Sequence, residues 1–70
     1  MEDKAKITKA LLPVLRMTRN LDDLLDLEYH KPGGSFEFVV ATFENGKKKH
    51  ANVTGDSGTA MIQDIISQLV

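Results

Sequence analysis

Glu28 and Glu37 are the first candidates for chemistry, because their expected positions bring two carboxylates together. Both lie in segments that alternate apolar and polar residues, and a four-residue turn at 31–34 would place them directly opposite each other. Paired carboxylates can share a proton and act as a general acid and base. An open sheet face would not desolvate them, so we expect a solvated acidic patch that could receive a basic partner.

The two histidines, His30 and His50, are the other candidates for chemistry. The chain has no cysteine, which excludes disulfides and thiolate metal sites. The two imidazoles are expected near opposite edges of a sheet, with no third ligand in view. We therefore expect surface histidines, no metal site and no cofactor.

Gly55-Asp56-Ser57-Gly58 resembles the sequence around the nucleophile of chymotrypsin-like proteases. Those enzymes need a much longer chain, and a histidine and a buried aspartate that converge on the serine. Here a helical pattern starts at once, so Asp56 or Ser57 is expected to cap a helix. An anion nest formed by the amides of Gly58 and Thr59 is the alternative, although Asp56 would repel a phosphate. No catalytic site is expected, and we predict a protein that is not an enzyme.

Residues 47–50, Lys-Lys-Lys-His, form a basic run. Strand alternation would send Lys48 and His50 to the open side of a sheet and Lys49 to the edge of the core side. Lysines on an edge strand commonly deter edge-to-edge pairing. The alternative is phosphate contact by these lysines and by those of the first helix. The net charge of −1 and the pI near 6.0 give no global basic field, so nucleic acid is the less favoured partner. The lysines of the first helix are Lys4, Lys6 and Lys9.

Apolar residues at helical spacing predict a helix at each end of the chain. The first is expected to kink at Pro13 and to end near Arg19, and residues 20–23 look like a capped helical turn. The last helix is expected to carry one apolar stripe, formed by Ile62, Ile65, Ile66 and Leu69.

Period-two alternation predicts three strands between these helices, at 25–30, 36–43 and 47–53. The turn at 31–34 and a two-residue Asn45-Gly46 loop would join them as an antiparallel meander in order 1-2-3. The registers set by the two loops agree, because both place the same apolar side chains on one face of the sheet. This predicts a single α+β domain over residues 1–70, in the order α-β-β-β-α, with both helices covering that face. The inward set is Leu25, Leu27, Tyr29, Phe36, Phe38, Val40, Ala51 and Val53.

The opposite face of the predicted sheet is the expected partner-binding surface. An apolar strip along the central strand would lie between acids on one side and bases on the other, whereas a face that meets only water is usually polar throughout. The alternative is an ordinary surface with one exposed phenylalanine. The expected partner-binding residues are the anchors Val39, Ala41 and Phe43 with the charged residues Glu28, Glu37, Lys48 and His50.

Length and hydropathy narrow the class of protein. Seventy residues bury a modest core, and without disulfides or a metal we expect self-association to support the fold. No apolar run approaches the roughly 20 residues that span a bilayer, and the start of the chain lacks the build of a secretory signal. A cytoplasmic protein with no membrane partner is expected.

The predicted order of elements resembles that of double-stranded-RNA-binding domains. Those domains carry a basic Lys-Lys-x-x-Lys-type start on the last helix, where this chain reads Asp-Ser-Gly-Thr-Ala at 56–60. The resemblance therefore covers topology without the RNA-binding residues.

Two further resemblances are to phage proteins. Residues 36–69 resemble phage head–tail joining proteins in their order of elements. FENG at 43–46, NVTGDSG at 52–58 and AMI at 60–62 are similar to short proteins of Gram-positive temperate phages. That similarity implies an accessory phage protein acting in the host cytoplasm, in a group that includes inhibitors of host defence.

Taken together, these features predict a non-catalytic protein-binding module that self-associates, with a phage-encoded inhibitor of a host protein as its most concrete form. Its partner would be another protein or a second copy of itself. Two alternatives stay open: a nucleic-acid-binding protein that uses the lysines at 47–49, and a head–tail structural protein, which would form rings.

Overall fold

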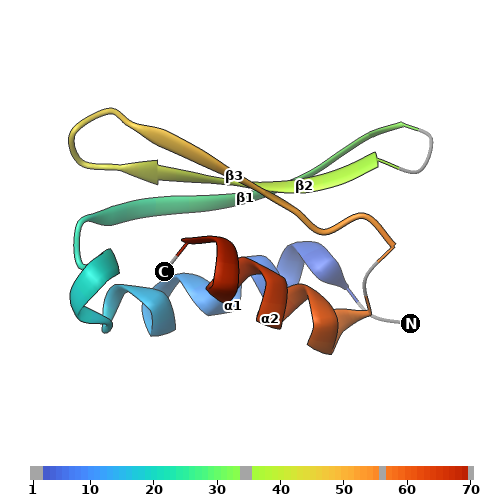
Figure 1. Ribbon diagram of the computed structural model, residues 1–70, viewed down its shortest axis with the longest axis horizontal. Coiled ribbons are helices and arrows are strands. Elements are labelled where there is room, and N and C mark those ends of the chain that lie inside the picture. Colours follow the sequence, from blue (N-terminus) through green and yellow to red (C-terminus); the bar gives the residue numbers. More distant parts are fainter. Residues whose placement is uncertain (1–2, 34–35, 56, 70) are drawn as a thin grey trace.

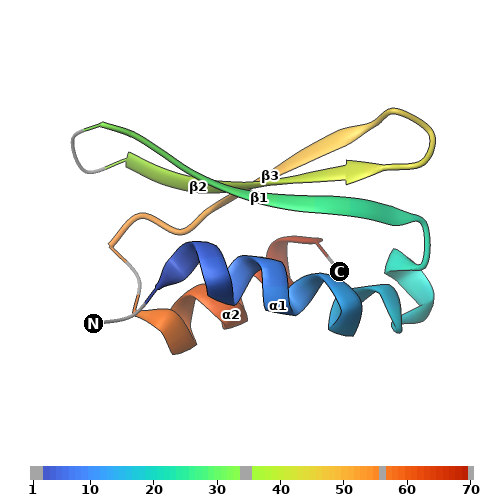
Figure 2. The same ribbon diagram turned by 180° about the vertical axis from the view of Figure 1, so that it is seen from behind.

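The computed structural model describes residues 3–33, 36–55 and 57–69. Two helices lie on one side of a three-stranded antiparallel sheet with strand order β1-β2-β3 (Figure 1). The view from behind shows the same two layers, and α1 packs mainly against β1 while α2 packs against β3 (Figure 2). The predicted α+β order is confirmed. The elements are α1 (Lys4–Arg16), the 3-10 helix η1 (Arg19–Leu21), β1 (Leu24–Gly33), β2 (Phe36–Phe43), β3 (Lys48–Asn52) and α2 (Gly58–Leu69).

Helix α1 begins at a side-chain cap and ends earlier than expected. Asp3 accepts a hydrogen bond from the amide of Lys6 at 3.1 Å, and Pro13 lies inside the helix. The helix stops at Arg16 rather than near Arg19. The hydroxyl and the amide of Thr18 both donate to the carbonyl of Leu15, at 2.7 and 3.0 Å, and so close the last turn. Neither α1 nor α2, the α-helices of the described chain, is long and apolar enough to cross a membrane.

The β2–β3 hairpin has a three-residue loop instead of the expected two-residue loop. The amide of Phe43 donates to the carbonyl of Lys47, and the amide of Gly46 donates to the carbonyl of Phe43, both at 2.9 Å. Gly46 has a φ of 83°, as in a type I turn followed by a left-handed bulge residue. Val39 therefore lies opposite Ala51, one residue away from the predicted register.

The β1–β2 hairpin departs further from the prediction. Strand β1 runs on to Gly33, and Leu27 pairs with Ala41 rather than with Phe38. This is an offset of three residues. Pairing is irregular between Leu24 and Asp26, so Leu24 is buried and Leu25 is 48% exposed. The prediction that Leu25 faces the core is wrong for this reason.

The two register changes turn β2 over. Because side chains alternate along a strand, an odd offset moves each residue to the other face. Val39 and Ala41 are fully buried beneath the helices and Phe43 is 7% exposed, so the expectation that they form an open strip is wrong. The core residues are Leu15, Leu21, Leu24, Leu27, Val39, Ala41, Phe43, Ala51, Val53, Met61, Ile65 and Leu69.

Candidate docking surface and buried carboxylate

An aromatic cluster occupies the sheet face that points away from both helices. The ring of Phe38 stacks on His30 with centroids 5.3 Å apart, and lies 5.7 Å from His50 and 5.5 Å from Phe36. The cluster thus spans all three strands. Phe36 is 52% exposed, and Phe38 is half-buried by its neighbours. We call this side the open face.

Next to the aromatic cluster, acidic residues on β1 lie across β2 from basic residues on β3. Glu28 and His50 lie on either side of Val40, and Asp26 and Lys48 lie on either side of Thr42. We call Asp26 and Glu28 the acid row, and Lys48 and His50 the base row.

Neighbouring side chains already contact both acids. Lys9 lies 3.0 Å from Asp26, and its hydrogen bond lowers the pKa of that carboxyl. The imidazole of His30 lies 3.2 Å from the carboxylate of Glu28. Both contacts are solvent-exposed and therefore weak, so the acids stay available to a partner.

The predicted site residues divide between the two faces. Glu28, Lys48 and His50 lie on the open face as expected, whereas Val39, Ala41 and Phe43 are core residues. Glu37 is also buried on the helix side, so the expected pairing of Glu28 with Glu37 is wrong. Phe36, Phe38 and Val40, which were predicted to face the core, lie on the open face instead. They take the outward positions predicted for Val39, Ala41 and Phe43.

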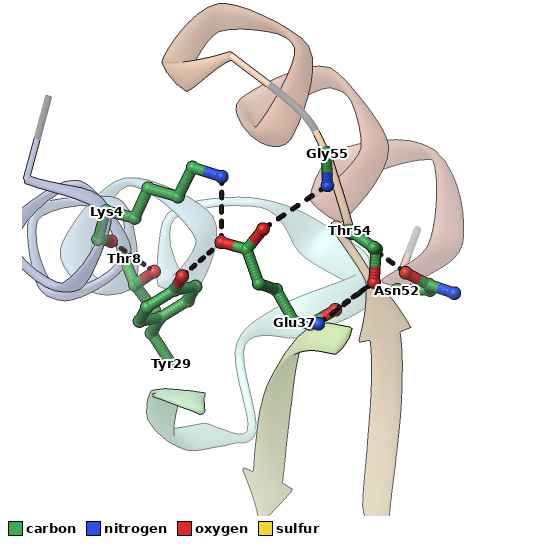
Figure 3. A network of polar contacts seen from close by, with 7 residues as sticks. All are labelled: Lys4, Thr8, Tyr29, Glu37, Asn52, Thr54 and Gly55. Atoms are coloured by element: carbon green, nitrogen blue, oxygen red, sulfur yellow. Dashed lines mark hydrogen bonds and ion pairs between the residues drawn. The ribbon is translucent and has the colours of Figure 1, made fainter. Parts of the chain in front are cut away.

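Glu37 is the centre of a polar cluster that joins four segments (Figure 3). Its Oε1 lies 2.9 Å from the Nζ of Lys4 on α1 and accepts a hydrogen bond from the hydroxyl of Tyr29 on β1. Its Oε2 accepts a hydrogen bond from the amide of Gly55 at 3.3 Å, in the loop before α2. Next to Lys4, the buried hydroxyl of Thr8 donates to the carbonyl of Lys4 at 2.8 Å.

The contacts between Glu37 and Tyr29 shift the pKa values of these two side chains in opposite directions. The hydrogen bond from Lys4, helped by those from Tyr29 and Gly55, lowers the pKa of Glu37 to about 2. Burial, and then the neighbouring carboxylate, raises the pKa of Tyr29 to about 12. At neutral pH the carboxylate stays charged and the phenol stays neutral, so this pair is poorly suited to proton transfer. The geometry is that of a structural clamp.

Hydrogen bonds continue from Glu37 to the outer edge of β3. The hydroxyl of Thr54 accepts from the amide of Glu37 at 2.9 Å and donates to its carbonyl at 3.1 Å, and the amide of Thr54 donates to the side chain of Asn52 at 2.9 Å. The Gln68 side chain from α2 pairs with both backbone groups of Asn52, at 3.0 and 3.1 Å. The side-chain amide of Gln68 thus makes the two hydrogen bonds that a neighbouring strand would make at the outer edge of β3.

Ser57 caps helix α2. Its hydroxyl accepts a hydrogen bond from the amide of Ala60 at 3.2 Å, and its carbonyl accepts one from Met61 at 2.8 Å. The cap predicted at Asp56 or Ser57 is thus confirmed for Ser57, and Asp56 lies outside the described residues. The serine of the protease-like sequence has a structural role at this helix end.

A groove of about 420 Å³ lies at the end of the sheet where the β2–β3 hairpin meets η1. The amide of Glu44 donates to the carbonyl of Asp23 at 3.0 Å and holds the hairpin against that turn. The ammonium of Lys49 lies 5.8 Å from the centre of the Phe43 ring. The groove is lined by Asn20, Leu21, Asp23, Phe43, Asn45, Lys47, Lys48 and Lys49.

No group of three or more histidine, aspartate or glutamate side chains that could hold a metal ion occurs within residues 3–33, 36–55 and 57–69. Comparisons with protein-family models, with curated proteins and with solved structures give no match.

Proposed function

We propose that this protein is a non-catalytic protein-binding module whose docking surface is the open face of its sheet. The observation that carries the proposal is the aromatic cluster around Phe38, which extends over three strands on the side away from the helices. Exposed apolar side chains that gather in one patch mark interaction sites more often than scattered ones do.

The composition of the open face supports a protein partner. Aromatic and aliphatic side chains of Phe36, Phe38 and Val40 form its centre, and charged side chains form its rim. Protein interfaces have the same arrangement, in which central aromatic residues carry most of the binding energy and rim charges set specificity. The rim carries both signs of charge, which suits a protein surface better than a polyanion.

A narrower proposal is that the module is an accessory phage protein that masks a host protein in the host cytoplasm. It rests only on the resemblance of residues 43–46, 52–58 and 60–62 to short proteins of Gram-positive temperate phages. The open face would be the surface that contacts the host protein.

Nucleic-acid binding is the second candidate, and the groove beside η1 favours it. Lys47, Lys48 and Lys49 line this groove together with the amide side chains of Asn20 and Asn45. Phosphate contacts release counterions, so this candidate predicts binding to RNA or DNA that weakens steeply with salt. Lys47→Glu with Lys49→Glu would abolish such binding, whereas docking on the open face would survive it.

The test is affinity capture with three baits: the unchanged protein, Phe38→Lys and Val14→Lys. Val14 is 57% exposed on α1, so its substitution adds the same charge at an apolar position away from the open face. The proposal predicts a partner that the unchanged protein and Val14→Lys retain and that Phe38→Lys loses. Confirmation requires the purified partner to show the same loss by calorimetry. Binding that survives Phe38→Lys would contradict the proposal.

A further inference from the structure

The charges on the open face are arranged in rows that follow the strands. The register places Asp26, Thr42 and Lys48 on one level and Glu28, Val40 and His50 on the next. The acid row on β1 and the base row on β3 therefore lie on opposite sides of the apolar centre on β2.

Two identical faces can pack against each other only about a two-fold axis that lies in the plane of the interface. With the axis close to the strand direction, β2 lies over β2 of the second copy and each β1 lies over the partner's β3. The acid row of each copy then faces the base row of the other. With the axis across the strands, β1 lies over β1, and acids face acids. The charge pattern favours the first arrangement and opposes the second.

We infer that the open face binds a second copy of this chain, about a two-fold axis close to the direction of β2. The inference rests on the proposed function and specifies the partner. The Phe38 and Val40 side chains of the two copies meet at the centre, and Asp26 of each copy lies opposite Lys48 of the other. The match is made twice, once on each side of the axis, as an isologous interface requires.

The size of the face indicates a weak dimer. Three strands about 4.8 Å apart and eight residues of about 3.3 Å each give a footprint of roughly 400 Å². This is small compared with the roughly 800 Å² that each partner buries in a standard interface. Dimers should therefore form in a concentration-dependent way and weaken with added salt, which screens the exposed rows.

Sedimentation equilibrium at low salt tests the inference, from about 1 µM to about 1 mM protein. The samples are the unchanged chain, Asp26→Lys, Lys48→Glu and the double variant Asp26→Lys/Lys48→Glu, because Asp26 and Lys48 lie on the same level. Each single change places like charges against each other on both sides of the axis, and should raise the dimer Kd about tenfold. The double variant exchanges the two charges of this level, so opposite charges face each other again and its Kd should return close to that of the unchanged chain. An equal mixture of the two single variants should also associate.

Two control variants identify the face that is involved. Lys6→Glu changes the net charge as Lys48→Glu does, but at an exposed position on α1, and should leave the Kd unchanged. Phe38→Lys should abolish the dimer. Circular dichroism of each variant confirms that it is folded before its Kd is compared.

Failure of this inference can be distinguished from failure of the proposed function. An unchanged chain that stays monomeric at the highest concentration would overturn the second copy as the partner, and the capture experiment would still decide the proposed function. A double variant no stronger than the single variants would overturn the strand-parallel two-fold axis. A dimer that persists in Phe38→Lys would overturn the second copy as the occupant of the open face, because association would then use another surface.

Discussion

Lys4 on α1 and Glu37 on β2 form an ion pair of 2.9 Å although 33 residues separate them in the chain. The same carboxylate accepts hydrogen bonds from Tyr29 and Gly55. One buried side chain thus fastens the first helix, two strands and the loop before the last helix. The clamp lies beneath the sheet and holds β2 with Phe36 and Phe38 turned outwards.

Glu37→Gln is expected to lower thermal stability at neutral pH and to reduce the loss of stability in acid. The pKa of Glu37 falls from its ordinary value of 4.5 to about 2 on folding. A carboxyl with a depressed pKa stabilises the fold fully above about 4.5, and this contribution is lost as the pH falls towards about 2. Thermal unfolding of the unchanged chain and the variant across this range measures the difference. Glu28→Gln, at an exposed position, is the control. An equal dependence of thermal stability on pH in the unchanged chain and in Glu37→Gln would contradict the clamp.

Truncation of Leu25 and of Leu27, two residues apart on β1, should change the free energy of unfolding by very different amounts. Leu27 is fully buried and Leu25 is 48% exposed, because the irregular pairing before Asp26 shifts the alternation. We expect Leu27→Ala to cost about 2–5 kcal/mol of unfolding free energy, and Leu25→Ala less than about 1 kcal/mol. Urea unfolding of both variants measures this contrast. Similar losses would mean that β1 has the simple alternation instead.

Gly46→Ala is expected to destabilise the β2–β3 hairpin by about 1–2 kcal/mol. Gly46 has a φ of 83°, and no atom lies within 4 Å of where a Cβ would be, so the cost is conformational rather than steric. D-alanine at the same position, introduced by chemical synthesis, favours positive φ and should retain stability. A loss of stability with D-alanine as large as with L-alanine would argue against the three-residue loop.

Gln68→Ala should expose the outer edge of β3. The Gln68 side chain pairs with the amide and the carbonyl of Asn52, and losing a hydrogen bond worth about 1 kcal/mol should speed exchange of the Asn52 amide several-fold. Gln63→Ala, an exposed glutamine on the same helix, is the matched control. Hydrogen exchange by NMR measures the rates. Unchanged exchange at Asn52 would show that Gln68 does not protect this edge.

The sequence was sufficient to predict the elements and their order, and the inward positions of Leu27, Tyr29, Ala51 and Val53. It misplaced β2 because the errors in the two turns were one and three residues, both odd. An odd offset in both turns moves every β2 side chain to the other face of the sheet. Apart from Leu25, the side chains of β1 and β3 keep their predicted faces. The agreement between the two turns could not reveal this error.

The composition of β2 could not correct its phase. The set Phe36, Phe38 and Val40 is as apolar as the set Val39, Ala41 and Phe43, so alternation alone does not choose between them. Glu37 adds to the ambiguity, because a glutamate is expected to face water unless it is paired. Its partners Lys4, Tyr29 and Gly55 come from distant parts of the chain, and no local pattern indicates that they meet.

Thiol accessibility tests whether Phe36, Phe38 and Val40 of β2 face away from the helices. The chain has no cysteine, so Val40→Cys and Ala41→Cys each introduce a single thiol at adjacent positions. Val40 lies on the open face and Ala41 is fully buried. In dilute folded protein we predict rapid labelling of Val40→Cys by a maleimide and strong protection of Ala41→Cys until the protein is unfolded. Protection of Val40→Cys with rapid labelling of Ala41→Cys would contradict the docking surface.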